Sequence, residues 1–268
     1  MNLTIIGAGK MGEALSRGIL KAGLVAPANF TITDVATDRV KALAAELGAT
    51  AAPDNTTAVR EASVIILAVK PNIIPSVCGE IASSLAPGTI VVSIAAGITI
   101  AQLENALARE DIIIARVMPN TPCLVGAGAI AVSFAHGAST EARQTVLELL
   151  GATGVVEEMP ERLLDAVTGL SGSGPAYVAV FIEALADGGV LMGLPRAQAQ
   201  ELAIQTVLGT AQLIQATKQH PAQVKDAVSS PGGTTIAGVA ALEDAGFRAA
   251  AIAAVKAATV RSRELSRE

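Results

Sequence analysis

The feature that most constrains the fold is a glycine-rich segment near the N-terminus. The apolar run from Leu3 to Ile6 leads directly into Gly7-Ala8-Gly9-Lys10-Met11-Gly12, and a helical pattern follows. A strand, a Gly-x-Gly-x-x-Gly loop and a helix in this order are the context that a dinucleotide-binding unit requires. There the glycines allow a tight turn, the approach of the backbone to a pyrophosphate, and close packing of helix on strand. Glycines alone could form only a turn, but these flanks favour a nucleotide site.

Further strand-like runs continue this pattern along the first half of the chain. They alternate with helical patterns and lie at residues 30–33, 64–69, 90–94, 112–117, 127–133 and 155–156. Continuous apolar runs of strand length are typical of parallel strands that are covered on both faces. The first half is therefore predicted to be an α/β fold, a Rossmann-type doubly wound parallel sheet.

The second half changes character, because Ala-rich helical patterns replace the strand-like runs. The helical run over residues 176–192 carries only two charges, Glu183 and Asp187. A helix with so little polar surface is buried, either inside a domain or against a second subunit. We predict a dinucleotide-binding domain over residues 1–160 and a C-terminal all-helical domain over residues 161–268 that forms a homodimer.

Asp34 is a candidate for contact with the adenosine ribose. It follows the second strand-like run and lies 22 residues beyond Gly12, about where an acidic residue bonds the ribose hydroxyls. Asp34 could equally cap the helix that follows it. A carboxylate facing the ribose repels a 2′-phosphate and favours NADH, whereas Thr37 and Arg39 could accommodate that phosphate. The choice between NADH and NADPH stays open.

Three other strand ends carry small or polar residues that could line a cofactor cleft. These are Val69-Lys70-Pro71, Ala95-Ala96-Gly97 and Pro119-Asn120-Thr121-Pro122. Ligands of open α/β sheets bind at the carboxyl ends of the strands, which favours a cofactor role. Proline and glycine also mark ordinary turns, so each segment could be only a connection.

A second chemical signal lies late in the chain, in Ser229-Ser230-Pro231-Gly232-Gly233-Thr234-Thr235. A helical run follows it, and hydroxyls and glycines before a helix N-terminus are typical of an anion-binding turn. Such a turn could hold a substrate carboxylate. The alternative is a helix cap built from serine and threonine.

Composition argues against several other classes of protein. The formal net charge is −5 with no basic cluster, and Trp is absent, so neither a phosphate backbone nor stacked bases of a nucleic acid are expected partners. Cys78 and Cys123 form no metal motif, and with only His136 and His220 besides, no metal site is expected. A long uncharged stretch, residues 81–103, is interrupted by Pro and Gly and does not predict a membrane span. With no visible signal peptide, a cytoplasmic protein is expected.

The scarcity of lysine and histidine side chains that could act as an acid or a base limits the reactions that the chain could catalyse. No lysine occurs between Lys70 and Lys218, and both histidines lie in polar contexts. Alcohol oxidation needs a group that takes the hydroxyl proton, usually His or Lys. A protonated imine already carries its proton and needs only a hydroxyl group that orients its nitrogen. This pattern favours reduction of C=N over reduction of C=O.

With these residues in view, the chain resembles the pyrroline-5-carboxylate reductases over essentially its full length. The resemblance rests on the glycine loop, on Val69-Lys70-Pro71, on Met118 to Pro122, on Ser171-Gly172-Ser173-Gly174-Pro175-Ala176-Tyr177 and on Ser229 to Thr235. It implies reduction of 1-pyrroline-5-carboxylate to L-proline by NADPH or NADH, the last step of proline biosynthesis. It also implies a Rossmann domain and a helical domain that dimerises, with dimers often assembled into a larger ring.

The same resemblance implies roles for particular residues. Ser230, Gly232, Gly233, Thr234 and Thr235 would hold the substrate carboxylate, with Thr235 bonded to the ring nitrogen, and Glu161 would lie near the substrate. The cofactor positions would be Gly7, Ala8, Gly9, Lys10, Met11, Gly12, Asn55, Val69, Lys70 and Ala96. The strand ends add Pro71 and Asn120 to this set, and the spacing beyond the glycine loop adds Asp34. Many members carry Ser, Asn or Arg near position 34, so Asp34 is a departure that puts NADPH preference in question.

Two alternatives share part of this pattern. A β-hydroxyacid-dehydrogenase-like oxidoreductase would have the same two-domain plan, but the lysine that such enzymes use early in the long helix is missing here. A non-catalytic dinucleotide-binding sensor would explain the glycine loop and leave Ser229 to Thr235 without a purpose.

Overall fold

A computed structural model describes residues 1–266, and the chain divides into two compact units. One unit contains residues 1–173 together with the C-terminal residues from Ala257 onward, and the other is Gly174–Lys256. This division falls later in the chain than the boundary predicted after residue 160, because the short helical turns over residues 161–173 pack on the sheet. The predicted domain limits stay a prediction.

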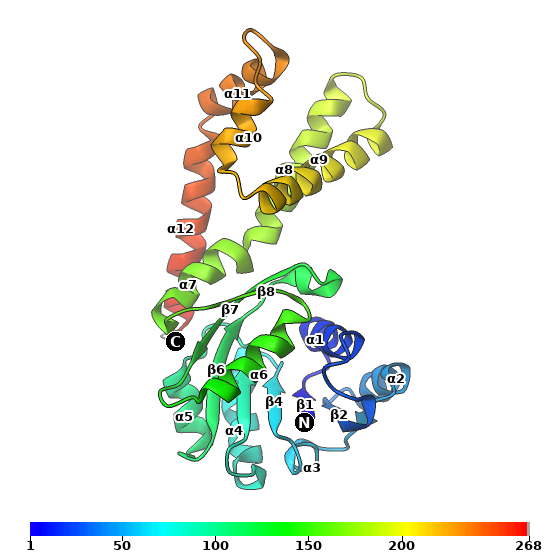
Figure 1. Ribbon diagram of the computed structural model, residues 1–268, viewed down its shortest axis with the longest axis vertical. Helices are drawn as coiled ribbons and strands as arrows, with labels where there is room; N and C mark the ends of the chain where they lie inside the picture. The colour runs from blue at the N-terminus through cyan, green and yellow to red at the C-terminus, as the bar shows by residue number, and fades with distance from the viewer. Residues whose placement is uncertain (267–268) are drawn as a thin grey trace. The chain divides into compact units, whose positions relative to one another are not determined.

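Within residues 1–266, eight strands form one sheet in the order β3-β2-β1-β4-β5-β6-β7-β8 (Figure 1). Their bounds are β1 (Leu3–Ile6), β2 (Phe30–Thr33), β3 (Thr50–Ala51), β4 (Val64–Leu67), β5 (Ile90–Ser93), β6 (Ile113–Met118), β7 (Gly128–Phe134) and β8 (Gly154–Glu158). The order reverses at β1, which pairs with both β2 and β4. This reversal is the switch point at which doubly wound sheets bind their ligands.

The predicted parallel sheet is confirmed for the strands from β3 to β6, but β7 is antiparallel to β6. Only residues 119–127 connect these two strands, and they contain a 3₁₀ turn instead of a helix. A parallel connection needs a crossover of about a dozen residues or more, so this short link can only reverse the chain. The helix after β7 then returns the chain to β8, which is parallel to β7.

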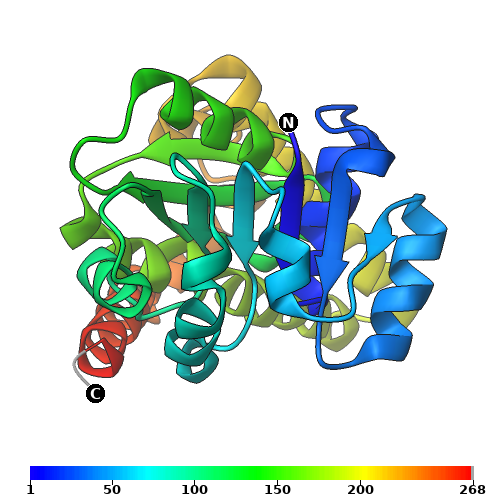
Figure 2. The same cartoon turned by 90° about the horizontal axis from the view of Figure 1, so that it is seen from below.

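Helices cover both faces of the sheet (Figure 2). They are α1 (Lys10–Lys21), α2 (Thr37–Leu47), α3 (Asn55–Val59), α4 (Ile74–Ile81), α5 (Ile100–Leu107) and α6 (Thr140–Gly151), followed by the short α7 (Leu164–Val167). Neighbouring residues of a strand point to opposite faces, so Ile5 packs in the cluster formed with α1, α2 and α6, and Ile6 in the cluster formed with α3, α4 and α5. Two apolar layers therefore hold the sheet from both sides.

The other unit is helical and buries little of its apolar surface by itself. Its helices are α8 (Gly174–Leu191), α9 (Arg196–Thr217), α10 (Pro221–Ala227), α11 (Thr234–Asp244) and the first part of α12 (Phe247–Leu265). Only a small cluster of Ala186, Ala199 and Ala203 is buried where α8 meets α9. Val180 is 65% exposed and Leu191 is 85% exposed in the single chain. Apolar helical faces of this extent are typical of surfaces that a second copy covers.

One helical segment, Glu161–Leu191, is long and apolar enough to cross a membrane when judged by length and composition alone. The same segment includes α8, whose apolar surface the dimer interpretation explains. The expectation of no membrane partner stays a prediction.

The close approach of α1 to the end of β1 yields a stability prediction. A Cβ added at Gly12 would overlap the carbonyl oxygen of Gly7, whereas a Cβ at Gly9 would meet no atom within 4 Å. Gly12→Ala should therefore lower the free energy of unfolding by about 1–3 kcal/mol, the usual cost of overpacking. Gly9→Ala is the matched control and should change it by less than about 0.5 kcal/mol. Urea unfolding at fixed protein concentration measures both, and equal losses would contradict the packing argument.

Candidate active site

The glycine loop has the shape that a pyrophosphate requires. Gly7 has a φ of +110°, and a Cβ there would lie 2.5 Å from the carbonyl oxygen of Ala68, so this turn accepts only glycine. Gly9 is the N-cap of α1, no side chain caps that helix, and the space beside Gly9 is open. The first N–H groups of α1 therefore face free space at the positive end of the helix dipole. This cradle fits the phosphates of a dinucleotide.

Asp34 holds this loop in place. Its Oδ2 accepts a hydrogen bond of 2.7 Å from the N–H of Ala8, and its Oδ1 accepts one of 2.9 Å from the N–H of Ala36. The suggestion that Asp34 is the cap of the next helix is wrong, because Ala36 is the N-cap of α2 and receives no side-chain cap. The carboxylate instead joins the end of β2 to the glycine loop, beside the predicted ribose position.

The strand order brings several predicted cofactor residues to one edge of the sheet. Val69, Lys70 and Pro71 follow β4, Ala96 follows β5 and Asn120 follows β6, and these strands are neighbours. Their carboxyl ends meet at the edge where β1 leads into the glycine loop, since all four strands are parallel. Only this edge could contact a dinucleotide that lies on the loop.

Two predicted cofactor residues already use their side-chain amides within the protein. Asn55 begins α3, and its Nδ2 donates to Glu80 Oε2 over 2.9 Å. Asn120 is buried; its Nδ2 donates to the carbonyl oxygen of Ser171 over 3.1 Å, and its Oδ1 accepts from the N–H of Ala129 over 2.9 Å. Asn120 therefore ties the end of β6 to β7 and to the segment before α8. Contact of either residue with a cofactor stays a prediction.

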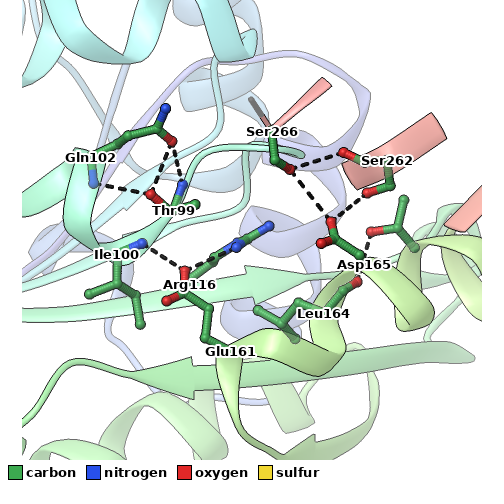
Figure 3. Close-up of polar contacts among 10 residues, drawn as sticks. Thr99, Ile100, Gln102, Arg116, Glu161, Leu164, Asp165, Ser262 and Ser266 are labelled. Atoms are coloured by element: carbon green, nitrogen blue, oxygen red, sulfur yellow. Dashed lines mark hydrogen bonds and ion pairs between the residues drawn. The ribbon is translucent and has the colours of Figure 1, made fainter. Parts of the chain in front are cut away.

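Glu161 forms a polar network with a residue that the sequence analysis did not select (Figure 3). Its Oε1 accepts two hydrogen bonds. One, of 2.8 Å, comes from the N–H of Ile100, the first residue of α5, and the other, of 2.9 Å, comes from Nη1 of Arg116. Arg116 lies in β6 and its side chain is 7% exposed. A buried cation needs a partner, so the pair fixes residue 161 beside the loop that follows β5. An arginine inside an otherwise apolar strand was the signal that could have found it.

The last residues of α12 lie against the same region. Ser262 and Ser266 donate to Asp165 Oδ1 over 2.7 and 3.5 Å (Figure 3). A Cβ on Gly97 would lie 3.7 Å from the Oγ of Ser266, so this helix end borders the loop that contains Ala96. The loop after β5 is thus enclosed by residues far away in sequence.

The turn before α11 is built from the second signal of the sequence. Gly232 has a φ of +66°, and the N–H of Gly233 donates to the carbonyl oxygen of Ser230 over 3.0 Å. Gly233 is the N-cap of α11 and no side chain caps this helix, so the predicted alternative of a serine or threonine cap is wrong. The first N–H groups of α11 are left for another acceptor, and Thr234 and Thr235 form the first turn.

Other reactive side chains take no part in these arrangements. Cys78 and Cys123 are buried, and burial raises the pKa of the Cys78 thiol to about 11, which keeps it protonated. His220 accepts from the N–H of Ala222 and caps α10. Among the residues that the structure describes, no group of three or more His, Cys, Asp or Glu side chains could hold a metal ion.

A Rossmann sheet with an open glycine loop and a separate helical unit defines the class of dinucleotide-dependent oxidoreductases. Residues 2–97 match the family model "NADP oxidoreductase coenzyme F420-dependent", and residues 161–265 match "Pyrroline-5-carboxylate reductase dimerisation". The pyrroline-5-carboxylate reductase of Synechocystis is 47% identical over 100% of this chain and 99% of its own, and that of Methanosarcina acetivorans is 46% identical over 98% and 97%.

Solved structures agree with these relatives. A pyrroline-5-carboxylate reductase from Coxiella burnetii superposes with a TM-score of 0.94 at 33% identity, covering 98% of each chain. Pyrroline carboxylate reductase from Plasmodium falciparum, solved with NADP bound, gives a TM-score of 0.87 at 33% identity over 99% of this chain and 98% of its own. The chain belongs to the pyrroline-5-carboxylate reductase family. It is an NAD(P)-dependent enzyme acting on C=N bonds, which decides against the hydroxyacid dehydrogenase and the sensor.

The pairing of Arg116 with Glu161 predicts an unequal response to loss of the cation. Arg116→Met should lower the free energy of unfolding by about 1–3 kcal/mol, because Glu161 loses a charged donor in a partly buried place. Arg248→Met is the control, since Arg248 pairs with Glu243 at an exposed surface where such a pair contributes about 0–1 kcal/mol. Urea unfolding compares them, and a loss for Arg116→Met no larger than for the control would contradict the role of the buried pair.

Proposed function

We propose that this protein reduces the C=N bond of 1-pyrroline-5-carboxylate with NADPH or NADH and forms L-proline, the last step of proline biosynthesis. The observation that carries the proposal is the full-length similarity to reductases of that name, at 41–47% identity. The dinucleotide supplies a hydride to the carbon of the C=N bond. Two parts of the sheet unit would hold this dinucleotide. They are the open loop at Gly9 with the first turn of α1, and the strand ends at Val69 to Pro71, Ala96 and Asn120.

The first turn of α11 suits the substrate carboxylate. Its N–H groups have no side-chain cap, and a helix N-terminus stabilises an anion through those donors and the helix dipole. Gly232 has the positive φ of +66° that this turn requires, and a Cβ on Gly233 would overlap the Oγ of Ser230, so both positions suit glycine. Ser230, Thr234 and Thr235 add hydroxyls at the same place, and we assign them and the two glycines to substrate binding.

Thr235 suits the ring nitrogen. Its hydroxyl makes no hydrogen bond to any group within residues 1–266, and the side chain is half-buried in the first turn of α11. A protonated imine needs a partner that orients its N–H, and a threonine oxygen accepts that bond without taking the proton. Thr235 is our candidate for the catalytic residue, and Glu161, fixed by Arg116, is our candidate for a nearby substrate contact.

Three further assignments complete the proposal. The helical unit forms the homodimer through its exposed apolar faces, with larger rings of dimers as the next level of assembly.

The cytoplasm is the proposed location, because Cys78 and Cys123 are both free thiols and the cytoplasm keeps thiols reduced. NADH is the preferred cofactor, because the carboxylate of Asp34 lies at the end of β2 and would repel a 2′-phosphate.

The test of this function is oxidation of NADH and NADPH with 1-pyrroline-5-carboxylate, and Thr235→Ala is the decisive variant. Loss of its hydroxyl should lower kcat/KM by about tenfold to a thousandfold, as one lost oriented hydrogen bond does. Thr235→Ser keeps the hydroxyl and should lose less than about tenfold. Both variants should still bind the dinucleotide. Wild-type protein that binds NAD(P)H but forms no L-proline would refute the substrate, and unchanged kinetics of Thr235→Ala would remove Thr235 from the mechanism.

Replacement of Asp34 tests its effect on cofactor preference. Asp34→Ser should raise the ratio of kcat/KM with NADPH to kcat/KM with NADH, because a 2′-phosphate no longer meets a carboxylate. Both values should also fall, since serine cannot accept from Ala8 and Ala36 as the two carboxylate oxygens do. The ratio is therefore the readout. If the ratio equals that of the wild type, Asp34 has no effect on cofactor preference and serves only to hold the glycine loop.

A further inference from the structure

A charged cluster of four residues joins the first turn of α1 to α2. Glu13 divides its carboxylate between two arginines: Oε1 accepts from Nε of Arg17 over 2.9 Å, and Oε2 accepts from Nη2 of Arg39 over 3.2 Å. Arg17 also makes a two-pronged pair with Glu46, at 2.6 and 2.8 Å. Arg39 has no second carboxylate among the described residues.

The position of this cluster connects it to the cofactor. Glu13 lies in the first turn of α1, directly after the glycine loop, and Arg39 lies in the first turn of α2, five residues beyond Asp34. In dinucleotide-binding folds, the adenosine ribose lies between these two helix starts, and an arginine near the acidic residue accommodates a 2′-phosphate. Arg39 is the arginine at that place, but its guanidinium points to Glu13.

We propose that Glu13 acts beside Asp34 in setting cofactor preference, by holding Arg39 away from a 2′-phosphate. For NADPH to gain Arg39 as a partner, the pair with Glu13 must break, and the phosphate must then lie near the carboxylates of both Glu13 and Asp34. NADH needs neither change, because its ribose 2′-hydroxyl carries no charge. This inference rests on the proposed function only in placing the dinucleotide on the glycine loop. Glu13 acts through Arg39 and is a specificity-determining residue that touches neither substrate nor reacting atoms.

The proposal predicts that the two residues act as one unit. In Glu13→Gln the ratio of Kd for NADP⁺ to Kd for NAD⁺ should fall by about two- to fivefold, the range that release of one surface ion pair spans. Arg39→Gln alone should change the ratio by less than about twofold, because Arg39 is already withheld. In the double variant the effect of Glu13→Gln should disappear, which is the signature of coupled residues.

Glu46→Gln is the matched control. It removes the same charge from the same cluster, but Glu46 contacts Arg17 and not Arg39, so both hydrogen bonds of Glu13 remain. Its ratio of dissociation constants should stay within about twofold of the wild type. Isothermal titration calorimetry of the full chain with NAD⁺ and NADP⁺ measures all five proteins, and circular dichroism confirms that each is folded.

Different failures would have different meanings. An unchanged ratio in Glu13→Gln, an equal fall in Glu46→Gln, or a fall that persists in the double variant would each overturn the role of the Glu13–Arg39 pair. Folded wild-type protein that binds neither dinucleotide would instead overturn the proposed function. A fall in the ratio that requires both Glu13 and Arg39 is the result that we expect.

Discussion

The candidate site depends on one steric constraint, the contact of α1 with the turn that precedes it. Gly12 lies so close to the carbonyl of Gly7 that no side chain fits between them, and Gly7 in turn presses on Ala68 at the end of β4. The absence of two β-carbons therefore fixes both the direction of α1 and its distance from the sheet. The start of α1, which no side chain caps, is thereby held next to the open space beside Gly9.

A second constraint works across a long stretch of sequence. Arg116 is a cation within a buried sheet, and its partner Glu161 comes from the segment that follows the last strand. The cost of burying the guanidinium is offset only if that segment returns to the sheet and reaches the start of α5. The same carboxylate thus satisfies a buried charge and a free helix N–H. This explains why residues 161–173 belong to the unit of the sheet.

Local patterns predicted most of the first unit, because strand runs and the glycine loop each carry a signature over fewer than about ten residues. These local patterns did not predict that β7 is antiparallel to β6, because the direction of β7 depends on the length of the connection between the two strands. Nor did they predict the Arg116–Glu161 and Asp34–Ala8 contacts, which join residues 45 and 26 positions apart in the sequence. The turn at residues 229–235 was found by its composition, but whether a hydroxyl would cap α11 depended on side-chain geometry that no spacing encodes.

The double hydrogen bond of Asp34 has a consequence for how a ligand is received. A loop that must first be ordered binds more weakly, in proportion to the fraction of molecules in the competent state. Here the carboxylate fastens Ala8 and Ala36 within the protein itself, and each of its oxygens retains a second lone pair. Ribose hydroxyls can therefore join this hydrogen-bonded unit without displacing any of it. Asp34, proposed above to disfavour a 2′-phosphate, is thus also the residue that preorganises the glycine loop for either dinucleotide.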